Sequence, residues 1–303
     1  MNGFPLRFVR APLPGVPDHY LHIPPGHSPA ALAKLPVLVM VHGISRNAAE
    51  QALRASQNGL ADMVIVAPLF ERRQMGRYQQ LESGLAGLSA DAALNNLLDW
   101  LADEGFSTAR VNLFGFSGGA QFAHRFALLH PQRVARLCVA AAGWFTMPDT
   151  AVAWPAGLDA PPLPADLPGL LAVPTLVIAG RGDNLRTGSL NQCPAIDRQQ
   201  GRHRLARARS WTKAMQAAAR ASGLAPTARL QIVPANRHQF EAYAGEGGMF
   251  DLLSAWLRSP AATSTTKVGT APAIRSKANR RPHGLPATAP ASRGQNSEES
   301  SDV

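Results

Sequence analysis

Six short runs of apolar and β-branched residues recur along the chain, and segments with helical periodicity lie between them. This alternation is typical of a mostly parallel β-sheet with helices on both faces, because crossover helices join parallel strands and cover them on both sides. The runs span residues 36–43, 62–70, 109–116, 136–143, 174–180 and 228–235, and a weaker strand is expected within 18–24. We therefore predict an α/β fold in which the six stronger strands are buried on both faces.

The segments between these runs carry apolar residues at the spacing of a helix. In residues 89–105, for example, Leu94, Leu97 and Leu101 share one helical face. Ser89 is suited to cap the start of that helix, and Gly105 is suited to end it. Further helices are predicted at 47–61, 118–129, 206–222 and 247–258.

Two segments depart from the alternation. Residues 144–169 are rich in proline and aromatic residues and lie between two predicted strands, so we expect a loop or a small cap there. Residues 260–303 hold few large apolar side chains, and we expect them to form a disordered basic tail. In a chain of 303 residues that is 46% hydrophobic, residues 1–259 are long enough to form one α/β domain.

The sequence gives no indication of a membrane segment or a cofactor site. Its first residues hold no apolar stretch behind a basic one, and no run approaches the roughly 18 apolar residues that a membrane span needs. Cys138 and Cys193 form neither a metal-ligand spacing nor a disulfide framework. We expect a cytoplasmic protein that binds no membrane and needs no metal or other cofactor.

A formal net charge of +10 raises the question of an anionic partner. Cations gather in residues 198–213, where Arg204, Arg207 and Arg209 lie at the start of a predicted helix. We expect these arginines to form a solvated face opposite the apolar side of the helix, and an anionic substrate or surface is the alternative. No nucleic-acid-binding motif accompanies them, so no specific nucleic-acid partner is predicted.

Residues 115–119 read GFSGG, a G-x-S-x-G pattern with Ser117 between a strand-like VNLF and a helix-forming AQFAHRFALL. A serine at the apex of so sharp a turn has a strained backbone, and side chains two residues before and after it would collide, so glycine occupies both places. A tight turn with an incidental serine would give the same letters. The strand before it and the helix after it are the context that a nucleophile requires, so we predict a nucleophilic serine.

The GFSGG turn, the run HGISRNA and the small proline-rich insertion make residues 36–257 resemble the α/β-hydrolase superfamily, in particular its esterase and polyhydroxyalkanoate-depolymerase-like branch. The resemblance implies that Ser117 is the nucleophile, that an acid follows the 174–180 strand and that a histidine follows the last strand. Asp183 and His238 occupy those positions, with Asp197 as the reserve acid. By this resemblance His238 takes and returns the serine proton, and Asp183 orients the imidazole.

The same resemblance implies an oxyanion hole made of backbone N–H groups. One donor is expected from Gly118, directly after the nucleophile, and the other from the loop after the 36–43 strand. That loop reads His42, Gly43, Ile44, and Ile44 is the expected donor, although a simple strand-to-helix turn could carry the same residues.

The roof of the substrate site is expected from the 144–169 segment and from the loop after the second strong strand. Trp144, Phe145 and Trp154 come from the former, and Tyr78 comes from the latter. Such side chains favour an uncharged acyl chain or an aromatic ring, because ligand pockets are mostly apolar with few polar anchors.

These residues favour acyl transfer to water through an acyl-enzyme intermediate, with a small-molecule or polymeric carboxylic ester as the substrate. Two alternatives stay open. The same fold serves serine peptidases and amidases, and it can also serve as a catalytically silent binding protein, because a fold alone does not decide a function.

Overall fold

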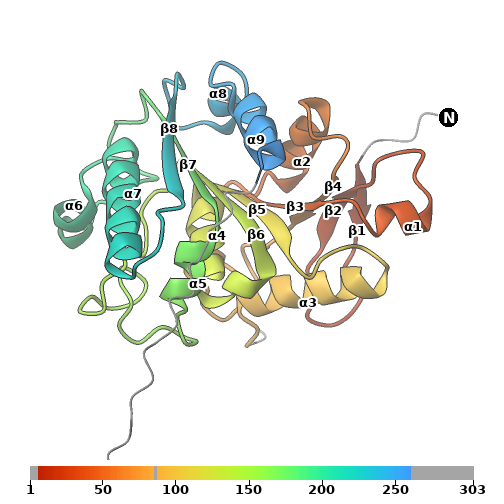
Figure 1. Ribbon diagram of the computed structural model, residues 1–303, viewed down its shortest axis with the longest axis horizontal. Helices are drawn as coiled ribbons and strands as arrows, with labels where there is room; N and C mark the ends of the chain where they lie inside the picture. Colours follow the sequence, from red (N-terminus) through yellow and green to blue (C-terminus); the bar gives the residue numbers. More distant parts are fainter. Residues whose placement is uncertain (1–5, 85–86, 261–303) are drawn as a thin grey trace, which may run out of the picture. The chain divides into compact units, whose positions relative to one another are not determined.

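The computed structural model describes residues 6–84 and 87–260. Its centre is one eight-stranded sheet with the strand order β1-β2-β4-β3-β5-β6-β7-β8 (Figure 1). The strands are β1 (Arg7–Val9), β2 (His19–His22), β3 (Val37–Val41), β4 (Val64–Pro68), β5 (Val111–Phe116), β6 (Val134–Ala140), β7 (Thr175–Gly180) and β8 (Ala228–Val233). β2 pairs antiparallel with β1 and β4, and every pair from β4 to β8 is parallel. The predicted mostly parallel α/β sheet is confirmed.

Helices cover both faces of the sheet. The α-helices are α1 (Pro29–Leu32), α2 (Ala48–Gln57), α3 (Ala90–Asp103), α4 (Gly118–Leu129), α5 (Leu167–Ala172), α6 (Pro194–Gln200), α7 (Arg204–Ala221), α8 (Phe240–Ala244) and α9 (Met249–Arg258). Two short 3₁₀ turns are η1 (Tyr78–Gln80) and η2 (Pro131–Arg133). The sequence missed β1 and the short helices α1, α5, α6 and α8, because three to seven residues carry too little periodicity to be recognised.

Successive residues of β3 supply two different cores. Val37, Val39 and Val41 pack on the face covered by α3, α4, α5 and α7, whereas Leu38 and Met40 pack on the face covered by α2, α8 and α9 (Figure 1). A strand that is apolar at every position is therefore buried on both sides, as the run in the sequence indicates.

The last strand is an exception to the prediction. β8 is expected to be buried on both faces, but Gln231 is exposed and the Ile232 side chain is 38% exposed. β8 lies at the edge of the sheet with β7 as its one partner strand. An edge strand of a doubly covered sheet receives less helix cover, so the expectation of full burial was wrong here.

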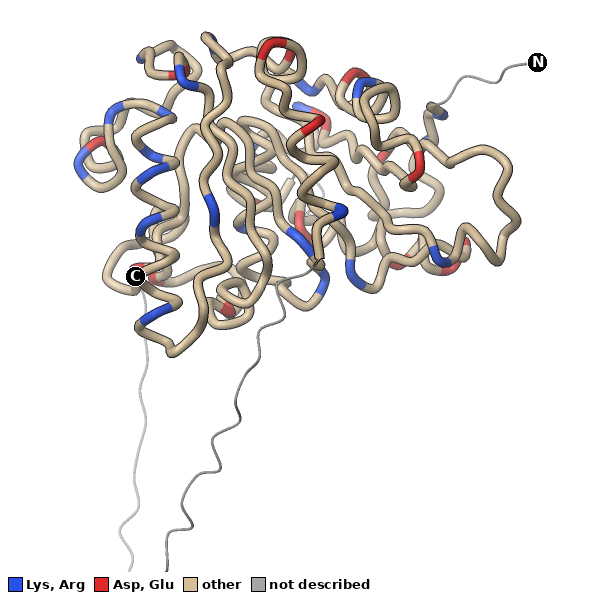
Figure 2. Tube along the Cα trace, turned by 45° about the horizontal axis from the view of Figure 1, so that its top comes forward, with Lys and Arg blue, Asp and Glu red and all other residues tan. Residues whose placement is uncertain are grey.

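The exposure of the arginines at the start of α7 also differs from the prediction. Lys and Arg positions follow one another along this helix, at the left of Figure 2. Arg209 is exposed, but Arg204 and Arg207 are 1% and 0% exposed, so the predicted solvated face does not exist at those two positions. The reason is charge pairing, because Arg204 faces Asp183 and Arg207 faces Asp197.

The proline-rich segment is irregular until α5 begins at Leu167, and it carries an isolated bridge between Ala153 and Asp159. The predicted tail lies beyond residue 260 and so outside the described residues. In the described part of the chain, every helix is too short or too polar to cross a membrane.

Candidate active site

The turn between β5 and α4 holds Ser117 in an uncommon backbone conformation. Its φ is 55° and its ψ is −112°, although it is not glycine. A Cβ on Gly115 would lie 2.1 Å from the Gly119 carbonyl oxygen, and a Cβ on Gly119 would lie 2.0 Å from the Val41 carbonyl oxygen. Real side chains do not fit at such distances, so the two glycines are what allows the turn to present a serine.

Three sequence-predicted side chains meet at this turn. Ser117 Oγ lies 2.9 Å from His238 Nε2, and His238 Nδ1 lies 2.8 Å from Asp183 Oδ2. They come from the carboxyl ends of β5, β8 and β7, which parallel pairing brings to one edge of the sheet. The His238 ring stacks on Phe116, with the ring centroids 5.5 Å apart and 13° between the planes. The imidazole is therefore held by hydrogen bonds at both nitrogens and by an aromatic face.

The Asp183 carboxylate is buried and fully engaged. Besides His238, its Oδ2 accepts a hydrogen bond from the Tyr243 hydroxyl at 2.9 Å, and its Oδ1 accepts one from Arg204 Nη1 at 3.3 Å. Burial alone would raise the pKa of Asp183, but the hydrogen bond and charge of His238, with Arg204 and Tyr243, hold the pKa below its ordinary value. Asp183 is therefore an anion in a site that shields it from water.

The reserve acid has a different role. Asp197 lies on α6, and its two oxygens accept hydrogen bonds from Arg186 at 2.6 Å and Arg207 at 2.8 Å. Its carboxylate is taken up by the two guanidinium groups, whereas Asp183 is the carboxylate that contacts His238.

The loop after β3 places Ile44 beside the nucleophile turn. The Gly43 carbonyl oxygen accepts hydrogen bonds from His42 Nδ1 at 2.8 Å and from the Arg46 backbone N–H at 3.0 Å. The Gly43 C=O and the Ile44 N–H belong to one planar trans peptide and point in opposite directions. Ile44 N lies 3.3 Å from the position that a Cβ on Gly118 would occupy, so the residues of the two predicted donors are neighbours.

Three side chains hold that loop, of which Tyr78 and His42 are buried and Arg46 is half-buried. The Tyr78 hydroxyl donates to the His42 carbonyl oxygen at 2.7 Å, and the Arg46 guanidinium donates to the Ile44 carbonyl oxygen at 3.0 Å and to that of Phe70 at 2.7 Å. His42 Nε2 accepts from the Phe70 N–H at 3.0 Å, which assigns the ring proton to Nδ1. Burial lowers the pKa of His42 to about 4, so the ring is neutral at pH 7 and keeps both bonds.

A cavity of about 390 Å³ opens above the nucleophile. Its lining combines the β3–α2 loop, the nucleophile turn and the start of α8: Gly43, Ile44, Ser45, Asn47, Glu50, Phe116, Ser117, Ser189, His238, Gln239, Phe240 and Glu241. Most of these residues are polar, two are carboxylates, and Lys and Arg do not occur in the lining that the described residues form. We refer to it as the active-site cavity.

The four residues expected to form the roof of the substrate site do not line the active-site cavity that the described residues form. Trp144 packs against the Arg125 guanidinium, 4.4 Å from the ring centroid, and Phe145 is fully buried in a stack on Trp211. Trp154 is partly buried against the core. The Tyr78 hydroxyl donates to the His42 carbonyl oxygen and lies 2.9 Å from the position that a Cβ on Gly118 would occupy, beside the nucleophile turn. None of the four contributes to the lining of the active-site cavity as the described residues form it, so a role of these four in substrate binding stays a prediction.

Three supporting residues escaped the sequence reasoning. Tyr243 and Arg204 contact Asp183, and Arg46 holds the Ile44 loop. Arg204 and Tyr243 lie 21 and 60 residues from Asp183 along the chain, and Arg46, although it lies two residues after Ile44, belongs to no motif. Residues 6–84 and 87–260 hold no cluster of three or more His, Cys, Asp or Glu side chains that could bind a metal ion.

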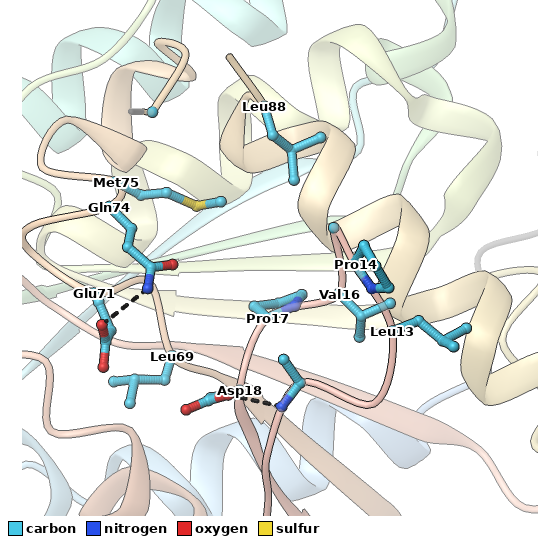
Figure 3. Close-up of a pocket in the computed structure, with 13 residues that line it drawn as sticks. Leu13, Pro14, Val16, Pro17, Asp18, Leu69, Glu71, Gln74, Met75 and Leu88 are labelled. Carbon is cyan, nitrogen blue, oxygen red and sulfur yellow. Dashed lines mark hydrogen bonds between the residues drawn. The ribbon is translucent and has the colours of Figure 1, made fainter. Parts of the chain in front are cut away.

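A second cavity, of about 310 Å³, lies beside the loop before β2 and the loop after β4 (Figure 3). Its walls are mostly apolar and include Leu13, Val16, Leu69, Met75 and Leu88. Asp18, Glu71 and Gln74 line it as polar groups, and Ser117, His238 and Asp183 are not part of it. We call it the Leu13–Leu88 cavity.

Comparison with known proteins gives one family and several related structures. The family model described as Esterase PHB depolymerase matches residues 18–154, a stretch that includes Ser117 and the Ile44 loop but neither Asp183 nor His238. No curated protein matches the chain.

Two solved structures share the fold over most of the chain. A poly(3-hydroxybutyrate) depolymerase from Bordetella parapertussis is 29% identical with a TM-score of 0.65, covering 81% of this chain and 85% of its own. Poly(aspartic acid) hydrolase-1 from Sphingomonas sp. KT-1 is 22% identical with a TM-score of 0.66, covering 79% of this chain and 93% of its own.

Proposed function

Since the chain is an α/β-hydrolase similar to esterases and poly(3-hydroxybutyrate) depolymerases, we propose that it hydrolyses carboxylic esters through an acyl-enzyme on Ser117. The observation that carries the proposal is the unbroken row from Ser117 Oγ through His238 to the Asp183 carboxylate, with hydrogen-bond distances of 2.9 and 2.8 Å. A nucleophile, a base within reach of it and a group that orients the base are what nucleophilic catalysis needs.

In the first half-reaction, Ser117 Oγ attacks the ester carbonyl carbon while His238 Nε2 takes the hydroxyl proton. Negative charge collects on the carbonyl oxygen, and the N–H groups of Ile44 and Gly118 stabilise it, helped by the positive end of α4. The tetrahedral intermediate then collapses, the bond to the alcohol oxygen breaks, and the alcohol leaves with the proton from His238. Asp183 stabilises the imidazolium throughout.

In the second half-reaction a water molecule replaces the alcohol. His238 takes a proton from the water, whose oxygen attacks the carbonyl carbon of the acyl-enzyme. Collapse of the second tetrahedral intermediate breaks the bond to Ser117 Oγ, which recovers its proton from His238. The products are one carboxylic acid and one alcohol, and the enzyme returns to its starting state.

The walls of the active-site cavity bear on the substrate class. Glu241 lies in the lining, Glu50 lies there in an ion pair with Arg54, and no Lys or Arg is among the described lining residues. An anionic group close to the reacting carbonyl would therefore meet no cation of the lining and would be repelled by Glu241. A neutral ester, small or polymeric, fits this charge pattern better than poly(aspartic acid), the polyanion named for one structural neighbour. We propose an uncharged ester as the substrate.

Amide hydrolysis is the second candidate, because the Sphingomonas neighbour is named for a polymer whose units are joined by amide bonds. The test is a panel of p-nitrophenyl esters of graded chain length, short 3-hydroxybutyrate oligomers and a set of peptides. We expect hydrolysis of the neutral esters. Cleavage of peptides without cleavage of esters would favour the amidase, and binding without any turnover would favour a silent fold.

A further inference from the structure

The triad acid has an unusual companion in Arg204, the first residue of α7. Its side chain is 1% exposed, and its two terminal nitrogens contact different parts of the site. Nη1 donates to Asp183 Oδ1 at 3.3 Å, and Nη2 donates to Ser189 Oγ at 2.9 Å. Ser189 lines the active-site cavity. One buried guanidinium therefore connects the acid of the triad with a wall of the cavity.

The contacts of the Asp183 carboxylate divide between its two oxygens. Oδ2 accepts from His238 and Tyr243, and Oδ1 accepts from Arg204. The Tyr243 hydroxyl is itself fixed, because it accepts a hydrogen bond from the Gly180 N–H at 2.7 Å. Rotation of the carboxylate would break contacts at both ends, so its Oδ2 stays directed at His238.

The charge of Arg204 has a second consequence. Asp183 and Arg204 form a pair of opposite charges, so the two together with a proton on His238 carry a net positive charge. Without Arg204 the same protonation would end in neutrality, and the carboxylate would favour the imidazolium more strongly. Other titratable or charged groups that interact with the pair are Tyr243 from α8, His203 before α7 and Arg207, one turn along α7 from Arg204. Glu50 and Glu241 lie in the cavity lining.

We infer that Arg204 is a positioning residue that fixes the Asp183 carboxylate and sets the acidic limit of activity. This inference rests on the proposed function, because it requires His238 to act as the base. Loss of the guanidinium should misplace the acid and also move the acidic limb of the pH profile of kcat/KM to higher pH.

Arg207 supplies a matched control, three residues along the same helix. It is 0% exposed, and it donates to Asp197 and to the carbonyl oxygens of Gly143 and Asn191. Arg207→Met removes a buried arginine from an acid outside the triad. Arg204→Met removes one from the triad acid. A purely structural role predicts the same kinetic behaviour for both variants.

The experiment measures kcat/KM for p-nitrophenyl acetate from pH 4.5 to 9 in the full chain and its variants. For Arg204→Met we expect kcat to fall about 10- to 100-fold and the acidic limb to move up by about one pH unit. Arg204→Lys keeps the charge but not both contacts, so kcat should fall while the limb stays in place. Arg207→Met should leave the limb in place. If Arg204→Met does not fold, Arg204→Gln takes its place with the same expected shift.

The possible failures are distinguishable. A wild-type protein that hydrolyses no ester refutes the proposed function, and this inference with it. An active wild type whose acidic limb is unchanged in the Arg204→Met or Arg204→Gln variant refutes this inference alone. An equal shift in Arg207→Met also refutes it, because the shift would then follow the loss of any buried arginine.

Discussion

The active-site cavity and the Leu13–Leu88 cavity differ little in volume, about 390 and 310 Å³, but greatly in what their walls offer. In the former, Ser117 and His238 point at one another, and the N–H of Ile44 lies beside them. In the latter, mostly apolar side chains face each other across the opening (Figure 3). Volume would rank the two cavities about equally, whereas the reactive groups in the lining separate them.

The carboxylate that contacts His238 and the carboxylates that line the Leu13–Leu88 cavity are also held differently. Asp183 is buried and contacts three side chains. Asp18 is half-buried and accepts a hydrogen bond from the Ala11 N–H at 2.7 Å, and Glu71 accepts one from Gln74 at 3.3 Å. A carboxylate takes part in a site when neighbouring side chains fix its position, as three of them do for Asp183. Substitutions in and around the two cavities test this difference between them.

Ser117→Ala should abolish ester hydrolysis, because it removes the nucleophile while the backbone turn keeps its glycines and the Ser117 N–H bond to the Ala140 carbonyl. We expect kcat to fall by about four to six orders of magnitude. Rates with a p-nitrophenyl ester and a thermal melt measure the two quantities. Met75→Ala, in the Leu13–Leu88 cavity, is the control and should keep its activity. Residual turnover within tenfold of wild type would contradict the assignment.

Asp183→Asn should lower kcat by roughly 10⁴-fold, since an amide that donates to His238 fixes the wrong tautomer. Asp18→Asn and Asp197→Asn make the same chemical change at carboxylates outside the triad. We expect kcat within a few-fold of wild type for both. Equal losses in Asp183→Asn and Asp197→Asn would leave the acid unassigned, and a crippled Asp18→Asn would erase the contrast between the cavities.

The free energy of unfolding of the protein should depend on pH through His42, at the end of β3. Its pKa is lowered from 6.5 to about 4 by burial, so the unfolded chain binds a proton below pH 6.5 that the folded protein refuses. Stability is therefore lost as pH falls, by about 2 kcal/mol from this group between pH 7 and pH 5. Urea unfolding at both pH values measures it. His42→Asn should lose about that much less over the same interval, and an identical loss would refute the assignment.

The smallest effect is expected at the proline-rich segment. Trp144 covers the Arg125 guanidinium and is outside the lining of the active-site cavity. If it contacts the substrate, as its sequence context predicts, Trp144→Ala should raise KM a few-fold for the best ester while kcat changes less. Steady-state kinetics over a chain-length series measure both constants. No change in either constant would exclude this segment from substrate binding.

The parts of the fold that sequence could predict are those governed by local sterics and periodicity. Gly115 is required by a contact within the turn itself, and Gly119 by the close approach of the Val41 carbonyl at the end of β3. β3 is apolar at every position because helices cover both of its faces. Exposure of Ile232 was missed, because an edge strand and a central strand can share the same apolar pattern. The expectation was wrong because the burial of a strand depends on how the neighbouring helices cover it, and the sequence of the strand itself does not show that.

The candidate site divides in the same way. Ser117, Asp183 and His238 were expected because the resemblance to α/β-hydrolases implies such residues after three of the strands, and the structure brings them together. Arg204 was expected in solvent, because an isolated arginine run reads as a polar helix face. Its burial depends on a carboxylate that lies 21 residues earlier in the chain, a pairing that local pattern cannot reveal.

Covalent labelling of the nucleophile is the most direct test that Ser117 is the reactive serine. A fluorophosphonate reacts with a serine only when a base and an oxyanion hole activate it. We therefore expect one adduct per chain, on the peptide that carries Ser117. Digestion and mass spectrometry locate the adduct, and Ser117→Ala should take up none. An adduct on another serine, or the same uptake by Ser117→Ala, would contradict the claim that Ser117, His238 and Asp183 form the active site.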